Sequence, residues 1–214
     1  MRSGPCCWGL FVTFSVLAVG ASNLDRSATS RQFSGSGRGA AVATASSQAL
    51  SGASLYQLES VWTTDRGEQV RLKDLDGTTE VLAMVFTRCT SQCPTLVHDL
   101  KSLDASMHGG ARTGTHFVLV TIDPQHDTPQ ALREFRDRMG LDPERWTLLR
   151  GTESDTRELA AVLGFAYGKG DGRNYTHSSL VTVLDRGGLI VHQQTGVGSD
   201  PMRTVAAIED AQAR

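Results

Sequence analysis

The sequence predicts one α/β domain with a central mixed β-sheet, an added N-terminal β-hairpin and flanking helices. Three observations carry this prediction: a continuous apolar run at 81–86, repeated strand-then-helix segments, and a hairpin pattern near the end of the chain. An apolar run without alternation is typical of a strand buried on both faces of a sheet. With 214 residues, 39% of them hydrophobic, the chain can bury one good core and less easily two.

The expected elements follow the order ββ, βαβα, βα and ββα. The expected strands are 55–64, 68–72, 81–86, 116–122, 145–149, 179–185 and 189–194. The expected helices begin at Pro94, at Thr128-Pro129, at Glu158 and at Asp200-Pro201. Proline at the first helical position and threonine before it are typical of helix starts, and Gly164 ends the third helix. The turn at 185–188 predicts an antiparallel hairpin at one edge of the sheet. The order fits a thioredoxin-like fold with an N-terminal hairpin added.

The first 54 residues are expected to lie outside this folded domain, which we place at 55–214. Residues 1–21 contain Arg2 and a 16-residue apolar stretch, marginally short for a membrane helix of about 20 residues. A cleaved signal peptide and a retained membrane anchor both fit this segment. Residues 22–54 are rich in serine, glycine and alanine and predict a flexible linker.

The same N-terminal segment indicates where the protein works. An export signal or anchor places the domain outside the cytosol, most readily in the bacterial periplasm, where a thiol pair can oxidise. A mitochondrial presequence is a third reading, because three arginines and many serines follow the apolar stretch. The apolar block itself argues against that reading, so the mitochondrial inner membrane is the less favoured location.

Composition argues against nucleic acid as a partner. The formal net charge is −2, and the chain has no run rich in lysine or arginine, whereas phosphate binding needs clustered cations. Aromatic residues make up 6% of the sequence, which is too few for a base-stacking platform.

Two cysteines, Cys89 and Cys93, lie where the buried strand gives way to a helix. The other two, Cys6 and Cys7, belong to the N-terminal segment. Free amides at a helix start favour a thiolate and lower its pKa, and Arg88 adds to this if its side chain folds towards the sulfur. Two alternatives are a pair of inert buried cysteines and a structural disulfide. A disulfide that closes so short a loop contributes little stability. Thiol-disulfide exchange and binding of a soft metal are the favoured chemistries.

Two sulfurs leave a metal under-coordinated, so a third ligand is expected, and His177 is the candidate. It lies in a glycine-rich loop before an apolar strand, facing the cysteine turn in a thioredoxin-like sheet. Thioredoxin-type reductases place a cis-proline in that position, but this chain has no proline between Pro143 and Pro201. The histidines expected to be on the surface or at the wrong end of the sheet are 98, 108, 116 and 192.

The segment VTIDPQHDTP ends a strand on the same side of the sheet as Cys89. We expect Asp123 and Asp127 to cap the following helix or brace the loop. A role for them and for His126 in supporting a bound metal from outside its ligand shell is the alternative.

Three motifs together, FTRCTSQCP, VTIDPQHDTP and a histidine before SLVTVLDRGG-LIV, resemble the SCO/SenC family of copper-binding, thioredoxin-like proteins. The resemblance covers about residues 55 to 198. It implies that one copper ion, Cu(I) or Cu(II), is bound by Cys89, Cys93 and His177, and that the two cysteines are also a redox-active pair. Many family members carry an N-terminal membrane tether. One departure is Thr176, where the family commonly has aspartate before the metal-binding histidine.

The resemblance also implies a partner and a role. The partner is the copper-site subunit of cytochrome c oxidase, to which such proteins deliver copper, or whose thiols they reduce. Other copper chaperones or thiol oxidoreductases are further expected partners. The chain is then a metallochaperone rather than a classical enzyme, with thiol-disulfide reductase activity left open.

Two alternatives remain: an extracytoplasmic thiol-disulfide oxidoreductase, and a copper or redox sensor with no dedicated oxidase role. A thiol peroxidase is disfavoured, because Phe86 and Leu82 stand where those enzymes commonly have Thr or Ser and proline.

Overall fold

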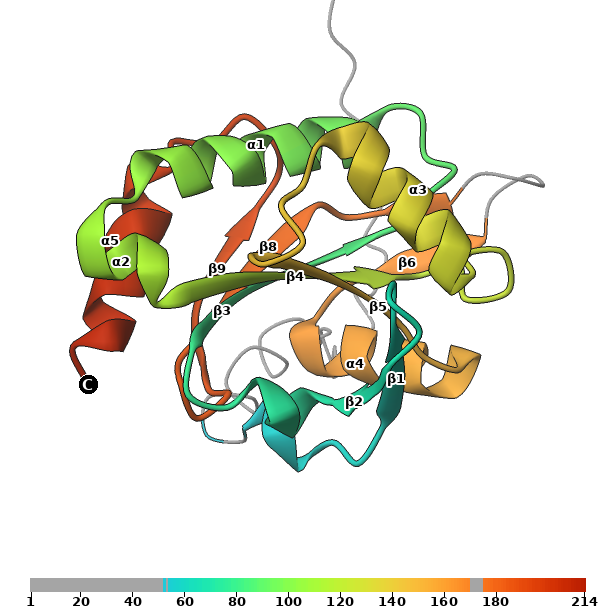
Figure 1. Ribbon diagram of the computed structural model, residues 1–214, viewed down its shortest axis with the longest axis horizontal. Helices are drawn as coiled ribbons and strands as arrows, with labels where there is room; N and C mark the ends of the chain where they lie inside the picture. Colours follow the sequence, from blue (N-terminus) through green and yellow to red (C-terminus); the bar gives the residue numbers. More distant parts are fainter. Residues whose placement is uncertain (1–51, 53, 170–174) are drawn as a thin grey trace, which may run out of the picture. The chain divides into compact units, whose positions relative to one another are not determined.

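The computed structural model describes residues 52, 54–169 and 175–214 (Figure 1). A seven-stranded mixed sheet has the order β2-β1-β5-β4-β3-β8-β9, and a second sheet contains β6 and β7. The strands are β1 (Val61–Thr64), β2 (Gln69–Arg71), β3 (Thr79–Val85), β4 (Thr115–Thr121), β5 (Trp146–Arg150), β6 (Tyr167–Lys169), β7 (Tyr175–His177), β8 (Leu180–Leu184) and β9 (Ile190–Thr195). The helices are α1 (Gln92–Ser106), α2 (Gly109–Thr113), α3 (Pro129–Met139), α4 (Glu153–Leu163) and α5 (Met202–Gln212), with short 3-10 helices η1 (Leu55–Gln57) and η2 (Leu72–Leu75).

Strand β3 lies at the centre of the core. All seven of its residues are buried, as its unbroken apolar run predicts. It pairs in parallel with β4 and antiparallel with β8, and Figure 1 shows α1 and α3 on one side of the sheet and α4 on the other. Because β3 and β4 are parallel, the loops that follow them lie at the same edge of the sheet. The cysteine motif follows β3 and the Asp123 motif follows β4, so the fold brings both motifs to one edge.

The expected mixed sheet, both hairpins and the flanking helices are confirmed, with different bounds for several elements. The first hairpin is shorter than expected, because Leu55–Gln57 forms η1. Helix α4 begins five residues earlier than expected, at Glu153, because Thr152 and Asp155 form a capping box. Helix α2 was not expected from the sequence. Helix α3 begins as predicted, with the Thr128 hydroxyl accepting a hydrogen bond from the Ala131 amide (3.2 Å), and it ends at Met139.

Two differences concern the segments expected to form a site. Helix α1 begins at Gln92, two residues before Pro94, so Cys93 lies inside the first helical turn. The glycine-rich approach to His177 was expected to be a loop, but its ends form the antiparallel strands β6 and β7, in which Tyr167 pairs with His177. The second difference arises from pairing across the glycine-rich segment, which the local sequence does not signal.

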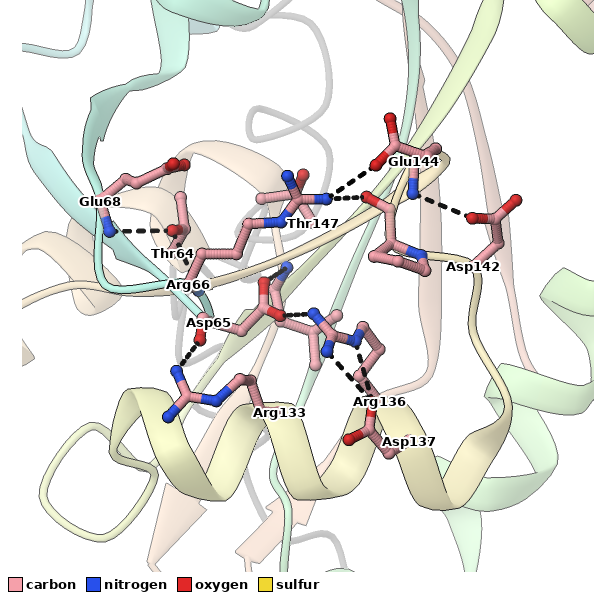
Figure 2. A network of polar contacts seen from close by, with 12 residues as sticks. Thr64, Asp65, Arg66, Glu68, Arg133, Arg136, Asp137, Asp142, Glu144 and Thr147 are labelled. Carbon is pink, nitrogen blue, oxygen red and sulfur yellow. Dashed lines mark hydrogen bonds and ion pairs between the residues drawn. The ribbon is translucent and has the colours of Figure 1, made fainter.

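The β1–β2 turn is fixed to α3 by Asp65, which is only 1% exposed. Figure 2 shows the Asp65 carboxylate paired with the Arg136 guanidinium and its backbone carbonyl accepting a hydrogen bond from Arg133 (2.7 Å). The carboxylate also accepts a hydrogen bond from the Leu148 amide of β5 (3.3 Å). The added N-terminal hairpin is thus joined to both a helix and the neighbouring strand.

The expected export or anchor segment, 1–21, and nearly all of the expected linker, 22–54, lie outside the described residues. The division of the chain into these parts therefore stays a prediction. Within 52, 54–169 and 175–214, no helix is long and apolar enough to cross a membrane.

Candidate metal centre

The two cysteines lie together at the end of β3 and the start of α1. The Cys89 amide donates to the Phe86 carbonyl (3.2 Å), which turns the chain directly after β3. The Cys93 amide then donates to Cys89 Sγ (3.3 Å), so a free amide of the first helical turn points at a sulfur. Both thiols are free; Cys89 is half-buried and Cys93 is fully buried. The structure therefore offers one accessible and one enclosed sulfur.

Burial raises the pKa of the Cys93 thiol above its ordinary value, and the neighbouring Cys89 thiol adds to the rise. A hydrogen bond with the Phe86 backbone opposes the shift but is outweighed. The expectation of a lowered thiol pKa is therefore wrong for Cys93, because loss of solvent around its sulfur outweighs the hydrogen bond that lowers the pKa. Without a metal ion, Cys93 retains its proton at neutral pH.

Alkylation distinguishes the two thiols. At pH 8 we expect iodoacetamide to modify half-buried Cys89 first and Cys93 at least about tenfold more slowly, because burial encloses the Cys93 sulfur and raises its pKa. The alkylation rate of Cys93 is expected to keep rising as the pH increases through the alkaline range. Peptide mass spectrometry over time measures both rates, and urea-unfolded protein is the control in which they converge. Equal rates in the folded protein would contradict the assigned burial.

Asp127 fastens the cysteine loop to the end of β4. Its carboxylate accepts hydrogen bonds from the Thr87 amide (3.0 Å) and the Thr87 hydroxyl (2.5 Å). It also accepts one from the Thr121 hydroxyl. Arg138 of α3 donates to the Thr87 carbonyl (3.1 Å) from the other side. The bracing role expected for Asp127 is confirmed, and it fixes the backbone two residues before Cys89.

Asp123 joins three segments through one buried carboxylate. Arg88 donates to Oδ2 (2.5 Å), and both His126 Nδ1 (2.8 Å) and the Tyr175 hydroxyl (3.1 Å) lie against Oδ1. Burial alone raises the pKa of Asp123, but the contacts from His126, Arg88 and Tyr175 outweigh burial and lower it. The guanidinium of Arg88, the residue directly before Cys89, is thus held by Asp123.

This ionised carboxylate gives a pH-dependent contribution to stability. Because the folded pKa of Asp123 lies below its unfolded value of about 4, the contribution is present above that value and is lost as pH falls through the folded pKa. We expect Asp123→Asn to flatten the loss of unfolding free energy between about pH 5 and pH 2. Urea unfolding at a series of pH values measures this, with exposed Asp137→Asn as the control. Parallel curves for Asp123→Asn and the parent would contradict the ionised assignment.

Sequence reasoning missed Tyr175, which connects β7 to this cluster. Besides its hydroxyl contact with Asp123, its ring packs edge-on against Phe86, with centroids 5.2 Å apart. His177 lies two residues further along β7, paired with Tyr167 across the hairpin, but its side chain lies outside what the structure describes. Among the described side chains, no three His, Cys, Asp or Glu groups are placed to hold a metal ion. The role of His177 as third ligand therefore stays a prediction.

The other histidines lie in the environments that the sequence predicts, except for His192. His98 and His108 are exposed. His116 lies at the opposite end of the sheet from the cysteines, with Nδ1 3.2 Å from the buried Glu80 carboxylate. His192 was expected on the surface but is half-buried, because its ring contacts a threonine hydroxyl of α5 (3.2 Å).

The family model described as SCO1/SenC matches residues 50–212. The chain belongs to the SCO1/SenC family. The match covers the cysteine motif, the Asp123 motif and His177, and so confirms the resemblance drawn from those motifs.

Individual relatives are distant. The SCO1 protein homolog of Bacillus subtilis (strain 168) is 23% identical over 138 residues, covering 63% of this chain and 71% of that protein. The solved structure of Bradyrhizobium japonicum ScoI with copper bound has a TM-score of 0.61 at 20% identity, covering 71% of this chain and 96% of that one. BsSco, a member of the Sco family of cytochrome c oxidase assembly proteins with a disulfide switch, has a TM-score of 0.63 at 22% identity, covering 72% and 91%. These likenesses confirm the thioredoxin-like fold.

Proposed function

We propose that this SCO1/SenC protein binds one copper ion through Cys89, Cys93 and His177 and passes it to the copper-site subunit of cytochrome c oxidase. The observation that carries the proposal is a pair of free thiols at a helix start, where the Cys93 amide donates to Cys89 Sγ, joined through one buried carboxylate to the strand that contains position 177. Copper is here the cargo, bound and released by the chain. Membership of a family that includes a copper-bound ScoI supports the choice of metal.

The donor chemistry fits a soft ion. Two sulfurs suit Cu(I), and an added imidazole nitrogen makes Cu(II) binding feasible. Cys93 holds its proton inside a desolvated environment, where a thiolate needs a positive charge beside it to be stable. A bound cuprous ion supplies that positive charge, and binding then releases a proton from Cys93. Oxidation of the pair to a disulfide removes both sulfur donors, so copper loading requires reduced thiols.

Anaerobic titration tests this proposal in the full chain with Cys6 and Cys7 replaced by serine, so that no other thiol competes. We expect one tight Cu(I) equivalent against a competing chelator in the reduced protein. His177→Ala is expected to weaken Cu(I) binding and to remove nitrogen coupling from the Cu(II) electron paramagnetic resonance spectrum. The matched control is His98→Ala, an exposed histidine of α1. Absence of tight binding in the reduced parent protein would overturn the proposal.

A second function, reduction of partner disulfides, is favoured by the unequal burial of the two thiols. Half-buried Cys89 can attack a partner disulfide, forming a mixed disulfide and releasing one partner thiol. Buried Cys93 then attacks the Cys89 sulfur, releasing the second partner thiol and leaving a Cys89–Cys93 disulfide. Two electrons and two protons pass from the chain to the partner. Cys93→Ser is expected to trap the mixed disulfide on non-reducing gels, and Cys89→Ser is expected not to form it.

We also propose an extracytoplasmic location, with the periplasm as the compartment and residues 1–21 as signal or anchor. The support is the charged and apolar pattern of that segment in the sequence. Fractionation followed by N-terminal sequencing separates the outcomes. A new N-terminus near Ala21 indicates cleavage, an intact N-terminus in the membrane fraction indicates an anchor, and an intact cytosolic protein would contradict both.

A further inference from the structure

One buried carboxylate joins the cysteine loop to the strand that contains position 177. The Asp123 side chain is 2% exposed and accepts from Arg88, the residue before Cys89 (2.5 Å). It also accepts from the hydroxyl of Tyr175, two residues before His177 (3.1 Å). Arg88 and Tyr175, which lie far apart in the chain, thus share Asp123 as their acceptor, and Tyr175 is 52 positions from Asp123. A hydrogen bond to a buried, ionised group is among the stronger kinds in proteins.

The Tyr175 side chain has two separable contacts. Its ring packs edge-on against Phe86, the residue that follows β3, and aromatic pairs of this geometry contribute beyond simple burial. Its hydroxyl makes the polar contact with Asp123. Replacement by phenylalanine retains the ring and removes only the hydroxyl, so the polar contact can be tested by itself.

Strands β6 and β7 need an anchor of this kind. They form a separate two-stranded sheet with three paired positions, outside the seven-stranded sheet. An isolated two-stranded hairpin is marginally stable in water. The contacts of Tyr175 with Phe86 and Asp123 therefore fix β7 relative to the end of β3, where the cysteine loop begins.

We propose that Tyr175 is a positioning residue for the metal centre: its hydroxyl bond to Asp123 holds β7 against the cysteine loop and so sets the place of the third ligand. The effect of Tyr175 on the metal ligand rests on the proposed function, whereas the anchoring of β7 can be tested in the protein without metal. Cu(II) depends on imidazole nitrogen more than Cu(I) does. Loss of the hydroxyl therefore weakens Cu(II) binding more than Cu(I) binding.

The test compares Tyr175→Phe with Tyr167→Phe in the full chain carrying Cys6→Ser and Cys7→Ser. Tyr167 is the matched control, because it lies in the partner strand β6 and undergoes the same loss of a hydroxyl. The first readout needs no metal: hydrogen exchange of the Ser178 amide, which donates to the Ala166 carbonyl at the end of the hairpin (3.0 Å). The second is Cu(I) and Cu(II) affinity with the nitrogen coupling of bound Cu(II).

We expect Tyr175→Phe to speed Ser178 exchange about tenfold and to weaken Cu(II) binding about tenfold, as loss of an outer contact to a metal ligand typically does. Cu(I) affinity is expected to change by less than about threefold, and Tyr167→Phe to match the parent protein. Parent-like exchange and Cu(II) spectra in Tyr175→Phe would overturn the positioning role while leaving the proposed function intact. If the parent protein binds no copper, the proposed function fails, and Ser178 exchange alone then supports or overturns the anchoring of β7.

Discussion

Replacing either Cys89 or Cys93 by serine is expected to abolish tight copper binding. Each change removes one of two sulfur donors, and a hydroxyl is a poor ligand for Cu(I). The loss should exceed the roughly 10–100-fold cost of removing an outer contact to a metal ligand. Competition with a Cu(I) chelator in the full chain, again with Cys6 and Cys7 replaced, measures the change.

The two variants differ in stability, which separates loss of a ligand from loss of the fold. Cys89 is half-buried, so Cys89→Ser is expected to unfold at nearly the parent urea concentration. Cys93 is fully buried, and a serine hydroxyl there costs about 1–3 kcal/mol unless it finds a partner. Cys93→Ala keeps an apolar side chain and tests the ligand role in a folded protein. Ser91→Ala is the matched control, because this N-cap side chain makes no capping hydrogen bond. Parent-like Cu(I) affinity in both cysteine variants would contradict the assigned ligands.

The sequence predicted the central elements because their signals are local. The unbroken apolar run of β3, the Thr128-Pro129 start of α3 and the Asp185–Gly188 turn each act within a few residues. The same local pattern, a buried strand followed by a helix, placed Cys89 and Cys93 at the carboxyl edge of the sheet. These predictions depend on no contact between distant segments.

The remaining features depend on such contacts. The β6–β7 hairpin has three-residue strands in a glycine-rich segment, too short for a period-2 pattern to stand out. Tyr175 meets Asp123 only because the hairpin folds against the loop after β4. The one signal in the sequence is aromatic: Phe165, Tyr167 and Tyr175 flank the glycine-rich segment, and their rings form a series of contacts.

The raised pKa of Cys93 has the same origin. A helix start predicts an activated thiol, but the sequence does not show that core side chains enclose this sulfur. Burial raises the pKa of Cys93 and the hydrogen bond with the Phe86 backbone lowers it, and burial is the larger effect. The exposed and enclosed members of the pair could be told apart only in the folded chain.

Asp65→Ala is expected to lower the free energy of unfolding by about 3 kcal/mol, the low end of the range for breaking a buried ion pair. The carboxylate is 2% exposed and pairs with Arg136, whose side chain is 12% exposed (Figure 2). Its removal leaves the guanidinium with Asp137 alone and leaves the Leu148 amide without this acceptor. Urea unfolding followed by circular dichroism gives the change.

Asp137→Ala is the matched control, because Asp137 binds the same arginine from a position 70% exposed to solvent. An exposed pair of this kind contributes at most about 1 kcal/mol. Asp65→Asn separates the two roles of Asp65: the amide oxygen can still accept from Leu148, but the negative charge opposite Arg136 is lost. An Asp65→Asn value near that of Asp65→Ala would assign the stabilisation to charge, and a value near the parent would assign it to the hydrogen bond. Parent-like stability in Asp65→Ala would show that the hairpin does not depend on this connection to α3.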